Sequence, residues 1–430
     1  MSINNSKKRA CVVVLGDFER SPRMKYHTLS LVKSGYDVDV VAYFDTSLSP
    51  ETHQEHKIHL HPMRDFTSCY RYLPRLLSYF LKAFLQSISL LCTLMIIKKP
   101  DFFLLQNPPS IPTLPIVYFV SRLRGTKFII DWHNYGFTIL ALSLNPNHLL
   151  VRLCRMIEGI FGSRADHNFC VSQAMAKDLK HRWNVEAVVL YDRPTPGFLP
   201  LNIGERCEFL EKIAQIYPEF RSDDGEGSKL CQIIEGKCEE RSDRPVIIIS
   251  GTSWTEDEDF NILLGALDEY DGQSDSSLPY LICVITGKGP LKDYYSNIIS
   301  RRGWHRVSVI TPWLSSEDYP KMVASADLGI SLHTSSSNLD LPMKIIDMFG
   351  CAVPVLAITY DCLNELLSEG YNGLTFRNSK DLLAHFLKLL KSPRHQISSM
   401  QDNLRKNRPQ FSWDTEWAKK MGPIISSKFD

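Results

Sequence analysis

Four small polar residues, Ser335–Asn338, lie between an apolar run typical of a buried strand and a helix expected over Met343–Phe349. A helix that begins after such a loop presents free backbone N–H groups and a positive dipole end, which together favour a phosphate group. Lys344 would add a cation in the first turn, and Asp347 would accept hydrogen bonds from ribose hydroxyls one turn later. The spacing predicts a nucleotide diphosphate site, although an ordinary crossover with a solvated loop has the same short pattern.

Two more loops of small residues follow apolar runs in the same half of the chain. Gly251–Trp254 comes after an expected strand, and Gly287–Pro290 comes after the next one. Because the carboxyl ends of parallel strands share one edge of a sheet, we expect both loops to converge with the first, and Lys288 to act as a second cation. The residues expected to bind the nucleotide-linked ligand are Gly251, Thr252, Ser253, Lys288, Gly289, Ser335, Ser336, Leu341, Lys344 and Asp347.

The first half of the chain offers a candidate proton acceptor. Asp131-Trp132-His133-Asn134 follows an apolar run, so its polar side chains are expected at the carboxyl end of a strand. His133 and Asp131 are candidates for a general base, acting directly or as a base and the group that orients it, and Asp17 is a further candidate. A single histidine beside an aromatic residue is also common as a hydrogen-bonded structural residue.

The segment Gly16–Arg23 lies between the first expected strand and the first expected helix, without the G-x-G-x-x-G spacing of a dinucleotide site. Gly16 would allow a ligand to approach the backbone, and Arg20 and Arg23 would meet a diphosphate with paired N–H groups. Ser21 followed by proline is also an ordinary helix start, and such capping leaves the arginines free.

Strands and helices alternate through both halves, which is typical of doubly wound parallel sheets. The expected strands are Cys11–Leu15, Val38–Tyr43, Phe102–Gln106, Phe128–Asp131, His167–Val171, Val188–Tyr191, Val246–Ser250, Leu281–Thr286, Val307–Ile310, Leu328–Leu332 and Val353–Ala357. We expect domains over 1–193 and 245–410, and a C-terminal helix within 411–430. Prolines and a polar stretch in 194–244 predict a linker with a mobile insertion.

Composition narrows the class of protein. A chain of 430 residues is too long for one core, and a net charge of +1 gives no reason to expect nucleic acid as a partner. The 11 cysteines include no C-x-x-C pair, so a zinc site or disulfide framework is not expected and a reducing cytosol fits better.

The first residues lead directly into a strand, without a signal peptide or N-terminal anchor. The apolar run Ala83–Ile97 is shorter than the ~20 residues of a spanning helix, and either a core helix or an interfacial helix is expected.

These segments together resemble the chitobiosyldiphosphodolichol beta-mannosyltransferases, a family of GT-B glycosyltransferases. The matching runs include GDFERSPRM (Gly16–Met24), DWHNYGFTILALSL (Asp131–Leu144), GTSWTEDEDF (Gly251–Phe260) and ITGKGPL (Ile285–Leu291), in the order of the family. The resemblance implies an α/β chain with the GT-B fold, in which two Rossmann-like domains have parallel sheets facing a central cleft. It also implies a last helix that packs back on the N-terminal domain. The chain departs from the family at the N-terminus, where an anchor is common.

The resemblance further implies inverting transfer of mannose from GDP-mannose to GlcNAc2-PP-dolichol, forming the first beta-1,4-mannose of the lipid-linked N-glycan precursor. The C-terminal domain would bind GDP-mannose. The N-terminal domain would bind the dolichol-linked chitobiose diphosphate through Gly16, Arg20, Arg23 and Asn134. The protein would act at the cytosolic face of the endoplasmic reticulum membrane, bound peripherally or monotopically to the membrane surface, with other early dolichol-pathway mannosyltransferases as candidate partners.

The acidic run Glu256–Asp259 invites comparison with the D-x-D metal motif of the other large glycosyltransferase fold. These acids directly precede an expected helix, where negative charge favours the dipole, and GT-B enzymes generally stabilise the leaving group with helix ends and basic side chains. We therefore expect no site-bound metal, with Mg²⁺ as a stimulating ion at most.

In the E-x7-E pattern of retaining GT-B enzymes, Asp347 matches the second acid, but Leu339 occupies the first position, with Asp340 displaced by one. Asn338, at a common glycine position, tolerates left-handed backbone.

Two alternatives remain open. Another GT-B mannosyltransferase of the dolichol pathway, with retaining chemistry, would keep a well-placed first acid. A catalytically silent scaffold for partner transferases would not need Lys288, Lys344 or Asp347, all of which are present.

Overall fold

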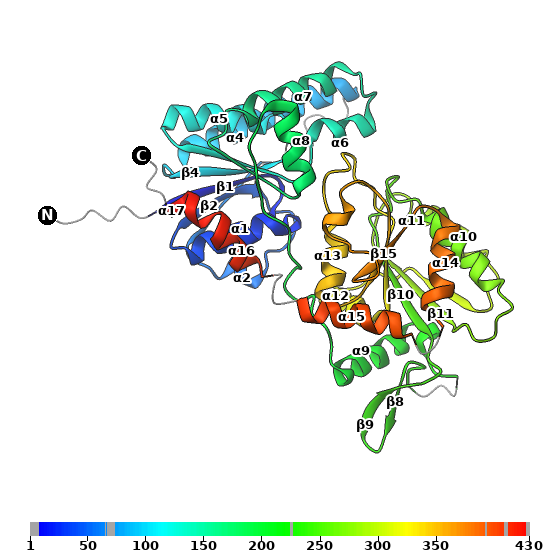
Figure 1. Cartoon of the computed structure of the whole chain (residues 1–430). Helices are drawn as coiled ribbons and strands as arrows, with labels where there is room; N and C mark the ends of the chain where they lie inside the picture. The colour runs from blue at the N-terminus through cyan, green and yellow to red at the C-terminus, as the bar shows by residue number, and fades with distance from the viewer. Residues whose placement is uncertain are drawn as a thin grey trace. The chain divides into compact units, whose positions relative to one another are not determined.

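The computed structural model describes residues 8–64, 66, 74–223, 227–391, 394–407 and 412–426. The chain divides into two compact units: Met1–Asp192 together with Trp413–Asp430 form the first unit, and Arg193–Ser412 form the second. Each unit is built on its own parallel sheet (Figure 1). The predicted α/β architecture of two Rossmann-like units is confirmed.

The first unit contains a seven-stranded parallel sheet in the order β3-β2-β1-β4-β5-β6-β7. Its strands are β1 (Arg9–Asp17), β2 (Asp37–Tyr43), β3 (Ile58–Pro62), β4 (Phe102–Asn107), β5 (Lys127–Trp132), β6 (His167–Cys170) and β7 (Val188–Val189). The strand order reverses between β1 and β4, and in such sheets ligands bind beyond the carboxyl ends of the strands at this point.

Helices cover both faces of the first sheet (Figure 1). They are η1 (Phe18–Arg20), α1 (Pro22–Lys33), α2 (Pro50–His53), α4 (Arg75–Ile96), α5 (Thr113–Arg124), α6 (Gly136–Ser143), α7 (Leu149–Gly162), α8 (Gln173–Trp183), α16 (Trp413–Lys420) and α17 (Gly422–Ser426). Helices α4, α5 and α7 lie on one face, whereas α1 and α16 lie on the other. Trp413 and Trp417 of α16 are buried, and Trp417 Nε1 donates a hydrogen bond of 2.9 Å to His27 Nδ1 of α1. The end of the chain is therefore part of the core of the first unit.

The second unit repeats the strand order, with a six-stranded parallel sheet β12-β11-β10-β13-β14-β15 and a separate hairpin of β8 and β9. Its strands are β8 (Cys231–Ile234), β9 (Lys237–Glu240), β10 (Val246–Gly251), β11 (Leu281–Thr286), β12 (Val307–Ile310), β13 (Leu328–Ser331), β14 (Val355–Ile358) and β15 (Gly373–Phe376). Its helices are α9 (Ile203–Ile216), η2 (Pro218–Phe220), α10 (Phe260–Asp271), α11 (Lys292–Ser300), α12 (Asp318–Ser325), α13 (Met343–Gly350), η3 (Leu363–Glu365), α14 (Ser379–Leu389) and α15 (His395–Asn407).

Strand β10 shows how this unit is layered. Ile247 and Ile249 face a core shared with α9, α12 and α13, whereas Val246 and Ile248 face a core shared with α10 and α14. Successive side chains of a strand point to opposite faces, so a central strand that is covered on both faces must be apolar throughout.

The prediction of a linker over 194–244 is wrong for most of that segment. Helix α9 begins with a capping box between Asn202 and Glu205, and its residues Phe209, Leu210 and Ile213 are buried in the core of the second unit. In the sequence this amphipathic helix adjoins a polar stretch, and the composition of the whole segment hides the helical pattern. Asp224–Glu226 of this segment and Phe411 of the predicted C-terminal segment lie outside the described residues.

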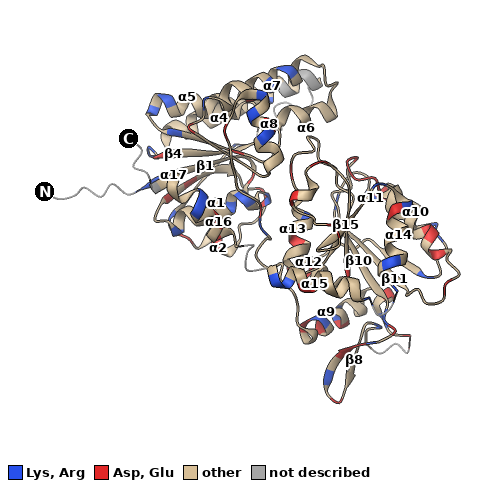
Figure 2. Ribbon diagram, viewed as in Figure 1, with Lys and Arg blue, Asp and Glu red and all other residues tan. Residues whose placement is uncertain are grey.

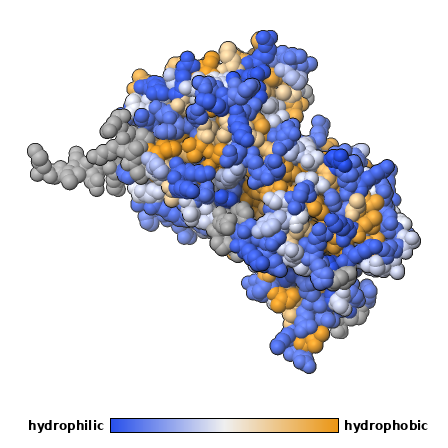
Figure 3. All heavy atoms as spheres, in the orientation of Figure 1, coloured by the Kyte–Doolittle hydropathy of each residue, from blue (hydrophilic) through white to orange (hydrophobic). Residues whose placement is uncertain are grey.

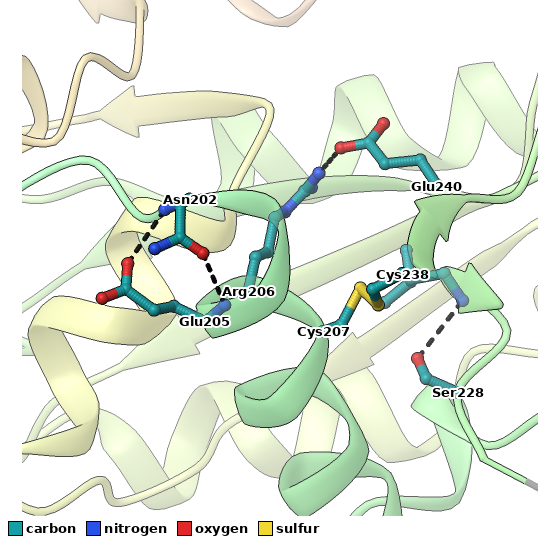
Figure 4. The surroundings of a disulfide bond; sticks show 8 residues. Asn202, Glu205, Arg206, Cys207, Ser228, Cys238 and Glu240 are labelled. Carbon is teal, nitrogen blue, oxygen red and sulfur yellow. Dashed lines mark hydrogen bonds and ion pairs between the residues drawn. A yellow bond between two sulfur atoms is a disulfide. The ribbon is translucent and has the colours of Figure 1, made fainter. Parts of the chain in front are cut away.

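No disulfide framework was expected, and the described residues contain one disulfide. Cys207 of α9 and Cys238 of β9 form a disulfide that ties the helix to the hairpin (Figure 4). Their separation of 31 residues gave no recognisable motif in the sequence. Among the described helices, none combines the length and the apolar content that crossing a membrane requires.

Candidate functional site

The loops after β10 and β11 touch through their backbones. A Cβ atom built on Gly287 would lie 1.8 Å from the carbonyl oxygen of Thr252, and one built on Gly289 would lie 1.7 Å from that of Ser253. Gly287 also has a φ of 149°, which side chains other than hydrogen rarely permit. The two glycines are therefore required for this approach, which brings together two of the predicted loops.

Lys344 in the first turn of α13 is joined to these loops by a carboxylate that sequence reasoning did not single out. Its Nζ atom lies 2.5 Å from Oε1 of the buried Glu258. The other oxygen of Glu258 accepts hydrogen bonds from the hydroxyl of Thr252 and, at 3.0 Å, from the N–H of Ser253. The acidic run was interpreted through the helix dipole, and Asp259 does cap α10 by accepting from the N–H of Asn261. Glu258 instead turns inward, a direction that the sequence pattern does not encode.

The loop before α13 is held by hydrogen bonds among its own polar side chains. Asp340 accepts from the hydroxyls of Ser335 and Ser337, and burial raises the pKa of its carboxyl. Asn338 has a φ of 58°, which confirms the predicted left-handed residue. Pro342, the N-cap residue of α13, makes no side-chain hydrogen bond to the helix. Its side chain therefore does not compete with a ligand for the first N–H groups of α13.

The remaining predicted ligands of the second unit have defined places. Lys288 is exposed, and its Nζ lies 3.8 Å from the centroid of the Trp313 ring, a cation–π contact. One carboxylate oxygen of Asp347 accepts a hydrogen bond of 3.0 Å from the N–H of Thr195. Leu341 is buried and Ser336 is half-buried. Gly251 is the last residue of β10, and a Cβ atom built on it would lie 2.6 Å from Tyr319 Oη.

In the first unit, Asp131 at the end of β5 is fully buried and is the centre of a cluster of cations and imidazoles. Its Oδ2 lies 2.7 Å from Nε of Arg23, 2.9 Å from Nε2 of His133 and 3.2 Å from Nε2 of His27. Burial alone would raise the pKa of this carboxyl, but Arg23 and His133 hold the pKa well below its ordinary value. Asp131 is thus an ionised, buried acceptor, and its role is to orient its neighbours.

His133 is partly exposed and has the arrangement of a general base. Because an ionised carboxylate can only accept, the Nε2 atom that faces Asp131 carries a proton, so Nδ1 is the atom of the neutral ring that has the lone pair. Among the described residues, no hydrogen-bond donor engages that Nδ1 atom. Orientation of an imidazole by a buried carboxylate is the arrangement that serine hydrolases use to activate a histidine.

The position of Arg23 does not support its predicted contact with a diphosphate. Its guanidinium is buried and binds both oxygens of Asp131, at 2.7 and 2.8 Å, together with Asp192 and the carbonyl oxygen of Leu190. These bonds connect α1 and β5 to Asp192, the last residue of the N-terminal segment of this unit. Sequence reasoning missed Asp192 and His27 as members of the cluster because both are distant in the chain.

The other predicted residues of the first unit make different contacts. Asp17 caps η1, accepts from the hydroxyl of Thr46, and lies 3.4 Å from Nε of Arg20, whose side chain is 80% exposed. Gly16 has only Val14 within 4 Å of a built Cβ. Asn134 Oδ1 accepts from the N–H of Tyr135 at 2.7 Å.

Glu158 of α7 is a second buried carboxylate that the sequence did not reveal. It accepts hydrogen bonds of 2.9 Å from Asn107 Nδ2, 2.6 Å from the hydroxyl of Ser110 and 2.7 Å from the N–H of Gly136. Burial raises its pKa. The carboxylate fastens the segment after β4 to the segment after β5, and so fixes the surroundings of His133.

Comparisons with known proteins show the family to which the chain belongs. The model described as Glycosyltransferase Family 4 matches residues 24–191, and the model described as Glycosyl transferase-like matches residues 276–420. The human protein named chitobiosyldiphosphodolichol beta-mannosyltransferase is 39% identical over 431 residues, with 97% of this chain and 92% of the relative covered. This chain belongs to the chitobiosyldiphosphodolichol beta-mannosyltransferase family.

Other relatives and solved structures place this family member among glycosyltransferases. An Arabidopsis thaliana protein named UDP-glycosyltransferase TURAN is 40% identical, with 97% of each chain covered. Anabaena Alr3699/HepE in complex with UDP and glucose has a TM-score of 0.67 at 15% identity, with 98% of this chain and 100% of that chain covered. WaaG, a glycosyltransferase involved in lipopolysaccharide biosynthesis, has a TM-score of 0.63 at 11% identity, with 97% and 100% covered. These structures support the GT-B fold of this chain.

Lys344→Ala is expected to raise the donor KM and lower kcat for sugar transfer, because charge on the leaving diphosphate grows in the transition state. The substitution also removes the partner of Glu258, so the double variant Lys344→Ala/Glu258→Gln is the control. Steady-state kinetics should show both variants impaired. Recovery in the double variant would mean that the lysine serves only to neutralise Glu258.

His133→Ala is expected to lower kcat by roughly 10²–10⁴-fold with little change in donor affinity. Added imidazole should restore part of the rate if a base has been removed, whereas a structural defect would not respond. Asp131→Asn is a poor test, since it also breaks the buried pair with Arg23 and should destabilise the protein by about 3–5 kcal/mol. Near-normal turnover of His133→Ala would contradict the assignment and make Asp17 the next candidate.

Proposed function

We propose that the protein transfers mannose from GDP-mannose, with inversion, to GlcNAc2-PP-dolichol, forming the first beta-1,4-mannose of the lipid-linked N-glycan precursor. The observation that carries this proposal is 39% identity across 97% of the chain to a chitobiosyldiphosphodolichol beta-mannosyltransferase. The residues of both candidate sites suit the reaction. The first unit supplies an oriented imidazole, and the second supplies cations and helix N–H groups for a diphosphate.

In the proposed reaction, Nδ1 of His133 accepts the proton of the attacking acceptor hydroxyl while GDP departs. The charge that develops on the departing diphosphate is met by Lys344, Lys288 and the first N–H groups of α13, without a site-bound metal ion. Mg²⁺ in solution would then act only as a stimulating ion.

Inversion is supported by the loop before α13. A retaining enzyme of the E-x7-E type would need an acid where Leu339 stands. The neighbouring Asp340 is bonded by two serine hydroxyls and belongs to the structure of the loop. A single displacement with one base is therefore the better fit.

The direct test is transfer from radiolabelled GDP-mannose to phytanyl-linked chitobiose diphosphate by the purified protein, with the product digested by a β-mannosidase. UDP-sugars are the necessary comparison, because the Arabidopsis relative is named a UDP-glycosyltransferase. Label that β-mannosidase releases is the expected result. An α-linked product would favour a retaining enzyme, transfer from a UDP-sugar would replace the donor, and no transfer would favour a scaffold.

We further propose that the protein works at the cytosolic face of the endoplasmic reticulum membrane, where the first unit contacts the bilayer. The contacting surface is the apolar helix face, formed by exposed residues of α4, α5, α6 and α7 (Figure 3). On α4 these are Leu77, Phe80, Phe84, Ile88, Leu91 and Met95, and on α7 they are Leu149, Leu153, Met156 and Ile160. Spacings of three and four residues place each set on one side of its helix.

The charge around this surface matches an anionic membrane. Residues 74–164 contain ten lysines and arginines but three acids, and Asp131 and Glu158 among these acids are buried (Figure 2). Helices α4 and α5, α5 and α7, and α6 and α7 pack against one another, so their exposed residues adjoin. An apolar face with basic neighbours is typical of helices that lie in the membrane interface.

The triple variant Phe84→Ser/Ile88→Ser/Leu91→Ser should bind more weakly to vesicles that contain phosphatidylserine. Its partition coefficient, measured by flotation, should fall by at least about 100-fold, since burying each apolar side chain contributes roughly 1.5–3 kcal/mol. All three side chains are exposed, so the variant should keep its fold and its turnover of a short-chain soluble acceptor. Ile233→Ser/Ile234→Ser, at exposed positions of the second unit, is the matched control. Equal flotation of both variants and the wild type would contradict attachment through this face.

A further inference from the structure

A second polar pocket lies at the opposite edge of the sheet in the second unit. The nucleotide loops follow the carboxyl ends of β10, β11 and β13, whereas this pocket is lined by residues that precede strands. Arg244 precedes β10, Asp327 precedes β13 and Val353 precedes β14. The cavity has a volume of about 280 Å³, which is enough for several water molecules or a small organic phosphate.

Four arginines line this cavity, which we call the arginine pocket: Arg206, Arg244, Arg394 and Arg405. Two carboxylates, Asp327 and Glu240, line it as well. The lining residues therefore carry a surplus of two positive charges, and one of these arginines, Arg405, also pairs with Asp402 at 3.1 Å.

Both carboxylates are already engaged. Arg244 binds Asp327 with two bonds of 2.7 and 2.9 Å and Glu240 with one of 2.7 Å. Arg206 of α9 pairs with Glu240 and donates a hydrogen bond of 2.8 Å to the carbonyl oxygen of Ser325. Asp327 keeps its pKa at about 2, because Arg244 outweighs the effect of its burial.

Arg394 lacks a comparable partner. Among the described residues, no carboxylate lies within ion-pair distance of its guanidinium, and the one hydrogen bond of its side chain runs 3.3 Å from Nη2 to the carbonyl oxygen of Arg244. Within the described part of the chain, the buried Nε atoms of Arg394 and Arg206 have no hydrogen-bond partner. Burial lowers the pKa of both guanidinium groups, as expected for cations that lack enough negative charge nearby. Buried donors without partners are uncommon in native proteins and call for a ligand or water.

We propose that the arginine pocket binds a small phosphate-bearing anion, at a site separate from the nucleotide loops. The planar guanidinium presents paired N–H donors that match phosphate oxygens, and the four groups around this cavity outnumber the carboxylates that pair with them. A negatively charged ligand would offset this surplus. Apolar residues such as Leu201 and Ile397 also line it, which leaves room for an organic group beside the phosphate.

The disulfide stabilises one wall of this pocket. Arg206 adjoins Cys207, and Glu240 lies two residues after Cys238, so the bond holds the Arg206–Glu240 pair in place (Figure 4). The hairpin and α9 thus form a wall whose geometry does not depend on a ligand.

The test uses the full-length protein and titrates inorganic pyrophosphate while the melting temperature is followed, with ionic strength held constant by sodium chloride. The wild type should show a saturable rise in Tm. Arg394→Gln and Arg405→Gln should each weaken the apparent Kd by roughly tenfold or more, because each removes charge-assisted hydrogen bonds. Neither arginine has a buried carboxylate partner, so both variants should fold.

Two controls separate this site from others. Arg301→Gln changes an exposed arginine outside the pocket and should leave the Kd unchanged. Lys344→Ala weakens any binding of pyrophosphate at the nucleotide loops, and the Tm shift that remains in this variant should be lost in Lys344→Ala/Arg394→Gln, so the outcome does not depend on the proposed transferase activity. A response that is the same in Arg394→Gln and the wild type, or one abolished by Lys344→Ala, would overturn the proposal.

A second arm identifies the source of the phosphate. Flotation with vesicles that contain phosphatidic acid is compared between the wild type and Arg394→Gln. Loss of binding in the variant indicates a lipid headgroup, whereas equal flotation together with the pyrophosphate shift indicates a soluble ligand. Absence of both the shift and a difference in flotation would refute the anion site.

Discussion

One buried carboxylate determines the arrangement of the first unit. Asp131 binds Arg23 of α1 and the imidazole of His133, and it lies 3.2 Å from the imidazole of His27 on the same helix. Arg23 also binds Asp192, and His27 accepts a hydrogen bond from Trp417 of α16. A charge that is fully removed from water is tolerated only when it is paired and hydrogen-bonded, so every one of these segments must be in place. The same requirement leaves His133 with a fixed ring orientation and a lone pair that faces away from the carboxylate. Stability and the capacity for proton transfer therefore depend on the same group.

The second unit uses the same kind of pairing at both edges of its sheet. At the carboxyl edge, Glu258 neutralises Lys344 and fixes the loop after β10; at the amino edge, Asp327 neutralises Arg244. The two edges differ in how many of their cationic side chains have a carboxylate partner. Lys344 is compensated without a ligand, whereas the amino edge has more guanidinium groups than carboxylates. The two edges are thus prepared for anions in different ways.

The sequence identified the parts that depend on local pattern. Buried strands such as β10 and β11 are continuous apolar runs, and helix starts such as that of α13 follow small residues, so both are visible in the chain. The short edge strand β3 was missed because its alternating histidines do not look like a strand, and β15 because four residues carry too little pattern. Partnerships such as Asp131 with Arg23 join residues 108 positions apart, and no local pattern encodes them.

The route of the chain through its two units has a consequence for how the protein is made. The second unit is inserted between Asp192 and Trp413, and the first unit takes its last core residues from the final segment of the chain. During synthesis from the N-terminus, the second unit can therefore complete its core while the first still exposes the surface that Trp413 and Trp417 will cover. The unit that is translated first is the one that finishes folding last, and a ribosome that stops shortly before the end would release a chain with one folded unit and one open core.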